Sequence, residues 1–130
     1  MHVLIIKPKQ GMSTPLAYAA YDRLAADENA HIIYPDTDGV RRAVEEGDAD
    51  LLCESVGNVL ELPVEREVPL ISVIKEDLIR KGALAGCMTG SGTAVYGLFD
   101  NAEIMHAAAL SFRDCGYIDK LSDVTETEFM

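Results

Sequence analysis

A turn almost free of side chains, set between two apolar segments, most limits how this chain can fold. Gly90 and Gly92 flank Ser91, and short buried strands are predicted on either side, over 84–88 and 94–99. Glycines placed in this way either adopt a backbone conformation closed to other residues or let backbone N–H groups approach a ligand closely. A structural hairpin turn and a ligand-binding loop fit this spacing equally well.

The charge and hydropathy of the chain exclude several classes of protein. Its 130 residues fit one domain with a buried core, and its net charge is −11. The Lys and Arg residues form no cluster larger than a pair, so a broad nucleic-acid-binding face is not expected. No run of about 18 apolar residues predicts a membrane span, and the N-terminus lacks a signal-peptide pattern. We therefore expect a cytoplasmic protein that binds neither nucleic acid nor membranes.

The side chains that could bind a metal are dispersed along the sequence. Neither the three histidines nor the three cysteines have the spacing of a zinc site or a disulfide framework. The cysteines are Cys53, Cys87 and Cys115. We expect reduced thiols and no dedicated metal site.

Apolar periodicity predicts a strand, a run of helices, the two strands around the glycine turn, another helix and a last strand. The first strand covers 3–6 and the last covers 117–121. The strongest helical pattern covers 65–81, in which Pro69 must fall in the first turn or end an irregular lead-in. A further helix begins after the capping pair Asp100-Asn101. Four strands with helices on one face form an α+β plait of the ferredoxin-like kind, with an antiparallel sheet.

The first helix is predicted to have Thr14 as its N-cap and Pro15 as its first helical residue. Tyr18 follows near the start of that helix, where an aromatic side chain serves either the edge of the core or a ligand, packing being the commoner role. A later helix is predicted from Asp48 to Leu60, although Gly57 weakens that pattern.

Two separated segments resemble the C-terminal domain of the GHMP kinase superfamily. One is Lys7-Pro8 with the following Gly11-Met12-Ser13-Thr14-Pro15-Leu16-Ala17-Tyr18, and the other is the glycine-rich stretch 88–99. Gly47-Asp48 and Gly57-Asn58-Val59-Leu60-Glu61 are also similar to this family. Within the superfamily, the resemblance is to the 4-diphosphocytidyl-2-C-methyl-D-erythritol kinases of isoprenoid biosynthesis, and it extends over nearly the whole chain.

This resemblance implies an ATP-dependent kinase that phosphorylates a hydroxyl group of a sugar alcohol linked to cytidine diphosphate. Thr14, Pro15 and Tyr18 would line the cytidine pocket, with the ring of Tyr18 facing the base. Stacking of this kind contributes ~1–3 kcal/mol per base.

The resemblance also gives the glycine turn a role. Gly90, Ser91 and Gly92, flanked by Thr89 and Thr93, would bring backbone donors close to the bound phosphates. Such donors suit phosphoryl transfer, in which positioning and charge stabilisation supply most of the catalysis. Thr93 stands where many relatives have proline.

The family's N-terminal domain, which carries the ATP loop and the catalytic Asp and Lys, has no counterpart in this sequence. The resemblance implies a GHMP kinase C-terminal domain at 1–124, a tail at 125–130, and no catalytic residue or metal site within this chain. ATP and magnesium would bind to the full-length parent, and this fragment alone is expected to carry no cofactor and to be inactive. The missing N-terminal kinase domain would be its partner, and the exposed domain interface would allow a homodimer.

Two other hypotheses remain open. The chain could be the corresponding domain of another GHMP kinase, acting on homoserine, mevalonate or galactose. It could instead be a stand-alone, non-enzymatic ferredoxin-like module that binds a metabolite or a protein, because a fold alone does not determine a function.

Overall fold

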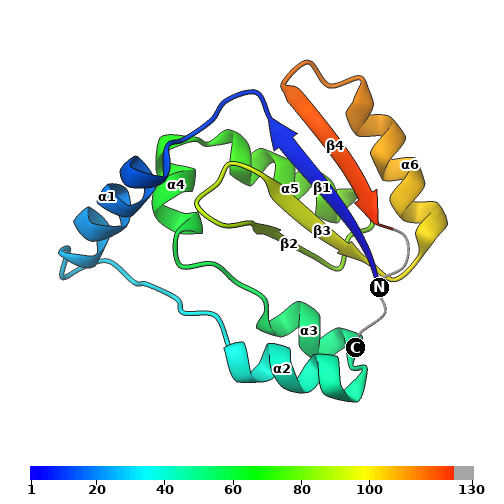
Figure 1. Ribbon diagram of the computed structural model, residues 1–130, viewed down its shortest axis with the longest axis horizontal. Coiled ribbons are helices and arrows are strands. Elements are labelled where there is room, and N and C mark those ends of the chain that lie inside the picture. The colour runs from blue at the N-terminus through cyan, green and yellow to red at the C-terminus, as the bar shows by residue number, and fades with distance from the viewer. Residues whose placement is uncertain (125–130) are drawn as a thin grey trace.

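A four-stranded antiparallel sheet organises the molecule, and helices pack against it (Figure 1). The computed structural model describes residues 1–124, so the predicted tail at 125–130 lies outside the described part. In chain order the elements are β1 (His2–Pro8), α1 (Thr14–Ala25), α2 (Thr37–Glu46), α3 (Ala49–Ser55), α4 (Glu61–Glu67), α5 (Leu70–Arg80), β2 (Ala85–Met88), β3 (Val95–Phe99), α6 (Ala102–Arg113) and β4 (Ile118–Val124). The predicted α+β class is confirmed.

The strands lie in the order β2-β3-β1-β4. The first strand of the chain is therefore internal, as its continuous apolar run suggests. Its residues pair in register with β3, from His2 opposite Phe99 to Ile6 opposite Val95. β2 has a neighbour on one side only, so it is an edge strand, and it leads into the glycine turn.

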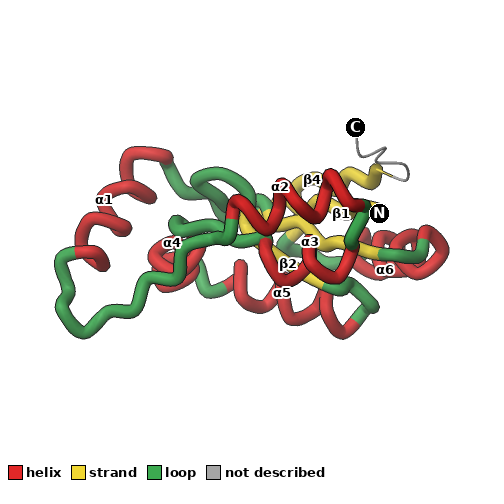
Figure 2. Tube along the Cα trace, turned by 90° about the horizontal axis from the view of Figure 1, so that it is seen from below, coloured by secondary structure: helices red, strands yellow, loops and turns green. Residues whose placement is uncertain are grey.

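Alternating residues send their side chains to opposite faces of this sheet. Leu4 and Ile6 of β1 join Val95 and Phe99 of β3 in the main core, where α5 and α6 also pack. Figure 2 shows both helices on the same side of the strands. The buried residues Ile71, Ile74 and Leu78 of α5 and Met105, Ala108 and Phe112 of α6 complete this core.

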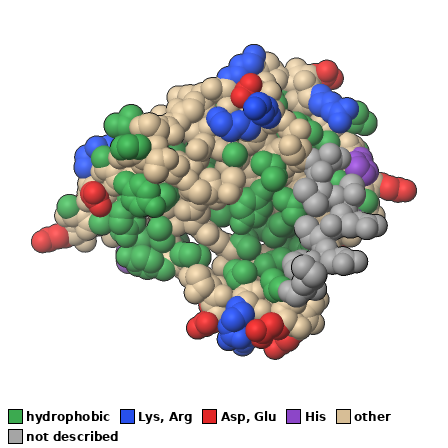
Figure 3. All heavy atoms as spheres, viewed as in Figure 1, with side chains coloured by type: hydrophobic (Ala, Val, Ile, Leu, Met, Phe, Trp, Pro, Cys, Tyr) green, Lys and Arg blue, Asp and Glu red, His purple; other side chains and the backbone are tan. Residues whose placement is uncertain are grey.

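The second face of the sheet carries a smaller apolar cluster. Leu98 of β3 packs there with Ala43 of α2 and Leu52 of α3, and Val3 and Tyr96 are partly buried against them. This α2–α3 pair adds a second layer to the predicted plait. In Figure 3 hydrophobic side chains are prominent across the centre of this side of the molecule.

Two predicted helices differ from those observed. The helix expected from Asp48 to Leu60 ends at Ser55, because the chain turns at Gly57 before entering α4. The helix expected over 65–81 is two helices, α4 and α5, which are separated at Val68 and Pro69. Val68 has φ −128° and ψ 79°, outside the helical region, as a following proline favours.

α1 lies at one end of the molecule, beside α4, in both views (Figures 1 and 2). Ala17, Ala20 and Leu24 are its buried residues. Among the described residues, no helix has the length and apolar character required to cross a membrane.

Candidate functional site

The glycine turn predicted between two strands is the β2–β3 hairpin loop, residues 89–94, called here the glycine loop. The N–H of Thr89 donates to the carbonyl of Ala94 at 2.9 Å, and the N–H of Gly92 donates to the carbonyl of Thr89 at 3.2 Å. Gly90 has φ 60° and Gly92 has φ 92°, so both need the freedom of glycine. Within residues 1–124, the N–H groups of Gly90 and Ser91 have no hydrogen-bond acceptor, so both can donate to a ligand.

The start of α1 contacts the glycine loop through one hydroxyl group. Ser13, and not Thr14, is the N-cap of α1, and its Oγ accepts from the N–H of Leu16 at 3.3 Å. The prediction that Thr14 caps the helix is therefore wrong by one residue. Thr14 is instead free to place its Oγ1 2.9 Å from Oγ of Ser91. The two segments singled out in the sequence thus meet directly, although 77 residues separate them.

Thr93 fixes the far end of the glycine loop from inside the molecule. Its side chain is fully buried, and its Oγ1 donates to the carbonyl of Gln10 at 2.6 Å. The same oxygen accepts from Nζ of Lys7 at 3.0 Å. Thr93 therefore joins the loop to the segment between β1 and α1, and it does not face the ligand side.

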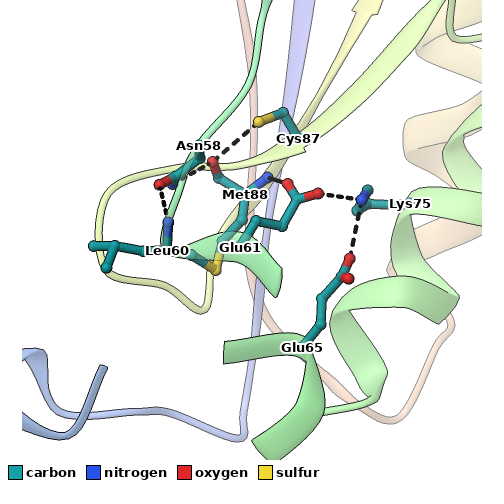
Figure 4. Close-up of polar contacts among 7 residues, drawn as sticks. All are labelled: Asn58, Leu60, Glu61, Glu65, Lys75, Cys87 and Met88. Carbon is teal, nitrogen blue, oxygen red and sulfur yellow. Dashed lines mark hydrogen bonds and ion pairs between the residues drawn. The ribbon is translucent and has the colours of Figure 1, made fainter. Parts of the chain in front are cut away.

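Two polar side chains just before and within α4 hold the exposed edge of β2 (Figure 4). Nδ2 of Asn58 donates to the carbonyl of Met88 at 2.9 Å and to that of Gly90 at 2.7 Å. Oε2 of Glu61 accepts from the N–H of Met88 at 2.6 Å. In a β-strand the N–H and C=O of one residue point to the same side, so Asn58 and Glu61 satisfy the outward-facing groups of Met88 as a neighbouring strand would.

A pocket of about 750 Å³ opens between α1, the segment before α4 and the glycine loop. Its lining residues are Thr14, Tyr18, Tyr21, Asp22, Gly57, Asn58, Val59, Leu60, Met88, Thr89, Gly90, Ser91 and Tyr96. We call it the loop pocket. Its size and mixture of apolar and polar groups suit a small-molecule ligand.

Five of the eight predicted site residues line the loop pocket together: Thr14, Tyr18, Thr89, Gly90 and Ser91. The other three do not. Pro15 lies in the first turn of α1, Gly92 packs against Met88, and Thr93 is buried. Tyr18 is 54% exposed, so it serves the pocket wall rather than the edge of the core.

Sequence reasoning missed roles for several lining residues. Tyr21 and Asp22 follow Tyr18 on α1 and could have been found from helical spacing. Asp22 is the charged residue among those that line the loop pocket. Tyr96 comes from β3, and burial together with its contact to Cys87 raises its pKa well above the ordinary range.

No three His, Cys, Asp or Glu side chains of the described residues converge in a group that could hold a metal ion. The ionic contacts close to the site are those of Lys75 with Glu61 and with Glu65. Burial by itself would lower the pKa of Lys75, but its hydrogen bonds to these two carboxylates and their negative charges outweigh burial and raise it.

Comparison with known proteins supports one family. The sequence profile described as "GHMP kinases C terminal" matches residues 40–117. The chain is 38% identical over 108 residues to the 4-diphosphocytidyl-2-C-methyl-D-erythritol kinase of Thermoanaerobacter pseudethanolicus, covering 83% of this chain and 36% of that protein. It is 37% identical over 115 residues to the enzyme of the same name from Lachnospira eligens, covering 88% and 38%. The chain thus spans little more than a third of the length of these relatives.

Solved structures agree on the fold. A crystal structure of 4-(cytidine 5′-diphospho)-2C-methyl-D-erythritol kinase superposes with a TM-score of 0.70 at 21% identity, over 95% of this chain and 41% of that one. The homoserine kinase from Cytophaga hutchinsonii superposes with a TM-score of 0.74 at 18% identity, over the same shares.

Proposed function

The chain belongs to the GHMP kinase family through its C-terminal domain, and on that premise we propose that it is the substrate-side domain of a 4-diphosphocytidyl-2-C-methyl-D-erythritol kinase. The observation that carries this proposal is the loop pocket, where the start of α1 and the glycine loop meet through the Thr14–Ser91 contact. An aromatic wall and a row of backbone donors then face one cavity. A nucleoside diphosphate can use both, the aromatic wall for its base and the backbone donors for its phosphates.

The base end of the ligand lies against α1 in this proposal. Tyr18 and Tyr21 both line the loop pocket from this helix. The exposed ring of Tyr18 offers a face on which cytosine can stack, and Thr14 offers a hydroxyl group beside it. Pro15 shapes the first turn of α1 and so acts on Thr14 and Tyr18 indirectly.

The phosphate end lies against the glycine loop. The N–H groups of Gly90 and Ser91 are without acceptors within residues 1–124, and Thr89 adds a hydroxyl group at the pocket wall. Backbone donors fixed before the ligand arrives stabilise phosphate charge without further reorganisation. Gly92 and Thr93 hold the loop on its core side, Gly92 by packing against Met88 and Thr93 by its hydrogen bond to the carbonyl of Gln10.

The chemistry itself is phosphoryl transfer from ATP to a hydroxyl group of the bound substrate. GHMP kinases use ATP, and we place ATP, magnesium and the catalytic groups on an N-terminal ATP-binding domain, in the part of the relatives that this chain does not match. Residues 1–124 then bind and orient the acceptor, which is the contribution that positioning makes to this reaction. By itself this chain is expected not to consume ATP.

A domain exchange tests the proposal. This chain would replace the matching region of the Thermoanaerobacter pseudethanolicus enzyme, and ATP-dependent phosphorylation of 4-diphosphocytidyl-2-C-methyl-D-erythritol would be measured. We expect activity, and we expect Tyr18→Ala to raise KM by about 10-fold or more through loss of stacking. Tyr18→Phe keeps the ring and should keep the KM.

Leu110→Ala provides the control, because Leu110 is 60% exposed on α6 and does not line the loop pocket. If the enzyme that carries the exchanged domain phosphorylates homoserine or mevalonate instead, this chain belongs to a GHMP kinase with that other substrate. Robust ATP turnover by the isolated chain would contradict the proposal that the catalytic groups lie on the N-terminal domain. An isolated chain that binds no nucleotide would favour a non-enzymatic module.

A further inference from the structure

The carboxylate of Glu61 makes two different contacts with its two oxygens. Oε2 accepts the N–H of Met88, the last residue of β2, directly before the glycine loop. Oε1 is hydrogen-bonded to Nζ of Lys75 on α5. Glu61 thus connects α5 to the base of the glycine loop through one side chain, as Figure 4 shows.

Lys75 also contacts a second carboxylate. Its Nζ lies 2.9 Å from Oε1 of Glu65, one helical turn beyond Glu61 on α4. The side chain of Lys75 is 27% exposed, and those of Glu61 and Glu65 are each 17% exposed. These three side chains form a largely shielded cluster of two negative charges and one positive charge.

The cluster has opposite consequences for a phosphate bound at the glycine loop. Glu61 fixes the loop mechanically, but a carboxylate at that place also repels an anionic ligand. Charge repulsion of this kind is strong where water is excluded. The ammonium group of Lys75 offsets part of the negative charge of the cluster, so the carboxylate of Glu61 holds the loop with less repulsion of phosphate.

Asn58 also holds the glycine loop in place, and it does so without adding a charge. Its amide donates to the carbonyls of Met88 and Gly90, and its own Oδ1 accepts the N–H of Leu60 at 3.0 Å. The neutral amide contacts the loop itself, whereas the carboxylate lies at the base of the loop and has a counter-ion.

We propose that Lys75 is a positioning residue that acts through Glu61: it keeps that carboxylate in place against Met88 and offsets its charge, and so sets the affinity of the glycine loop for phosphate. The identity of the ligand rests on the proposed function. The placement of the loop does not, because it can be measured without any ligand.

The test uses three variants at the cluster and one control variant of the 130-residue chain, with two measurements. Lys75→Met leaves the carboxylates of Glu61 and Glu65 without a counter-ion, and Lys75→Arg keeps the positive charge. Glu65→Gln removes one carboxylate, so that Glu61 and Lys75 remain as an ion pair with no net charge. Hydrogen exchange of the Met88 amide reports the Glu61 contact without ligand. Titration with cytidine diphosphate and with cytidine then separates phosphate binding from binding of the base.

We expect Lys75→Met to speed exchange at Met88 and to raise the Kd for cytidine diphosphate on the order of tenfold, with the Kd for cytidine unchanged. Lys75→Arg should behave as the unsubstituted chain. Glu65→Gln should leave Met88 exchange unchanged and lower the Kd for cytidine diphosphate, because it removes a negative charge. A purely structural cluster would instead make Lys75→Met and Glu65→Gln change binding in the same direction.

Arg41→Met is the control for loss of an ion pair, since Arg41 pairs with Glu45 on the surface of α2. Unchanged Met88 exchange in Lys75→Met would overturn the positioning role. If the unsubstituted chain binds neither cytidine diphosphate nor cytidine, the proposed function fails and Met88 exchange alone decides the positioning role. If Lys75→Met does not fold, Lys75→Gln takes its place with the same expected outcomes.

Discussion

At the scale of single residues, the two glycines of the glycine loop have different surroundings. A Cβ added at Gly90 would meet no atom within 4 Å, whereas one added at Gly92 would lie 2.9 Å from Sδ of Met88 and 3.3 Å from Cγ1 of Val64. Met88 is 1% exposed and Val64 is fully buried, so the added methyl group would press on side chains that are already packed. Gly90 lines the loop pocket, whereas Gly92 faces the core.

This difference predicts unequal costs for the same substitution. Gly90→Ala should lower the free energy of unfolding by about 1–2 kcal/mol, from the left-handed backbone alone. Gly92→Ala should lower it by about 1–3 kcal/mol more, because its methyl group also overpacks the core. Urea unfolding of both variants measures the difference. Equal losses would show that the loop moves away from Met88 at little cost.

At the scale of elements, α5 supports the sheet and carries Lys75. Ile74 is fully buried against the sheet, while Ile79 on the same helix is 49% exposed. Both are isoleucines in one helix, so their intrinsic helix propensities are the same. Only their burial separates them.

Ile74→Ala should therefore lower the free energy of unfolding by about 2–5 kcal/mol, through lost apolar contact and the cavity that remains. Ile79→Ala should change it by less than about 0.5 kcal/mol. Thermal or urea unfolding of the two variants checks this prediction. A comparable loss in both would mean that Ile79 is covered in solution.

The elements that the sequence predicts well are those whose cause is local. Apolar runs identify the strands, and Asp48 and Asn101 cap helices, each with a side-chain oxygen that accepts a backbone N–H. The sequence indicates the α4–α5 break only in part, because the apolar spacing continues through it. The signal was present in Pro69, which disfavours a helical conformation at Val68.

The candidate site was predictable to a similar degree. Thr14, Tyr18 and residues 89–91 stand out because each belongs to a recognisable segment, and they do line one pocket. The roles of Asn58 and Glu61 depend on β2 being an edge strand whose free backbone groups need partners. That requirement exists only after the sheet order is known, so no local pattern reveals it.

At the scale of the whole molecule, several buried or partly buried groups keep their protons to a higher pH than usual. Burial, followed by smaller contributions from neighbours, raises the pKa of Cys87 from 9.0 to about 12 and that of Tyr117 from 10.0 to about 12. The pKa values of Tyr96 and Lys75 are also raised. In the unfolded chain these groups lose their protons at lower pH than in the folded one.

Folding stability should therefore be fully present below about pH 9 and fall as the pH rises towards 12, because the unfolded state binds fewer protons there. Urea unfolding between pH 8 and pH 11 gives the slope. Tyr117→Phe should make the decline shallower, since it removes one of the titrating groups. A free energy of unfolding that stays constant from pH 8 to pH 11 would contradict the raised pKa values of these groups.

The position of β1 inside the sheet has a consequence for how the protein reaches this structure. Val3 pairs with Leu98 on one side and with Val124 on the other, so β1 can pair only after segments far along the sequence have been made. Sheets built from such distant pairings fold slowly, because a long loop must close before the contact is gained. Helix pairs such as α2–α3 and the β2–β3 hairpin are local and can form earlier. While a ribosome is still making α6, the apolar β1 strand has no sheet neighbour on the β4 side, and we expect this interval to be the time at which the chain most needs a chaperone.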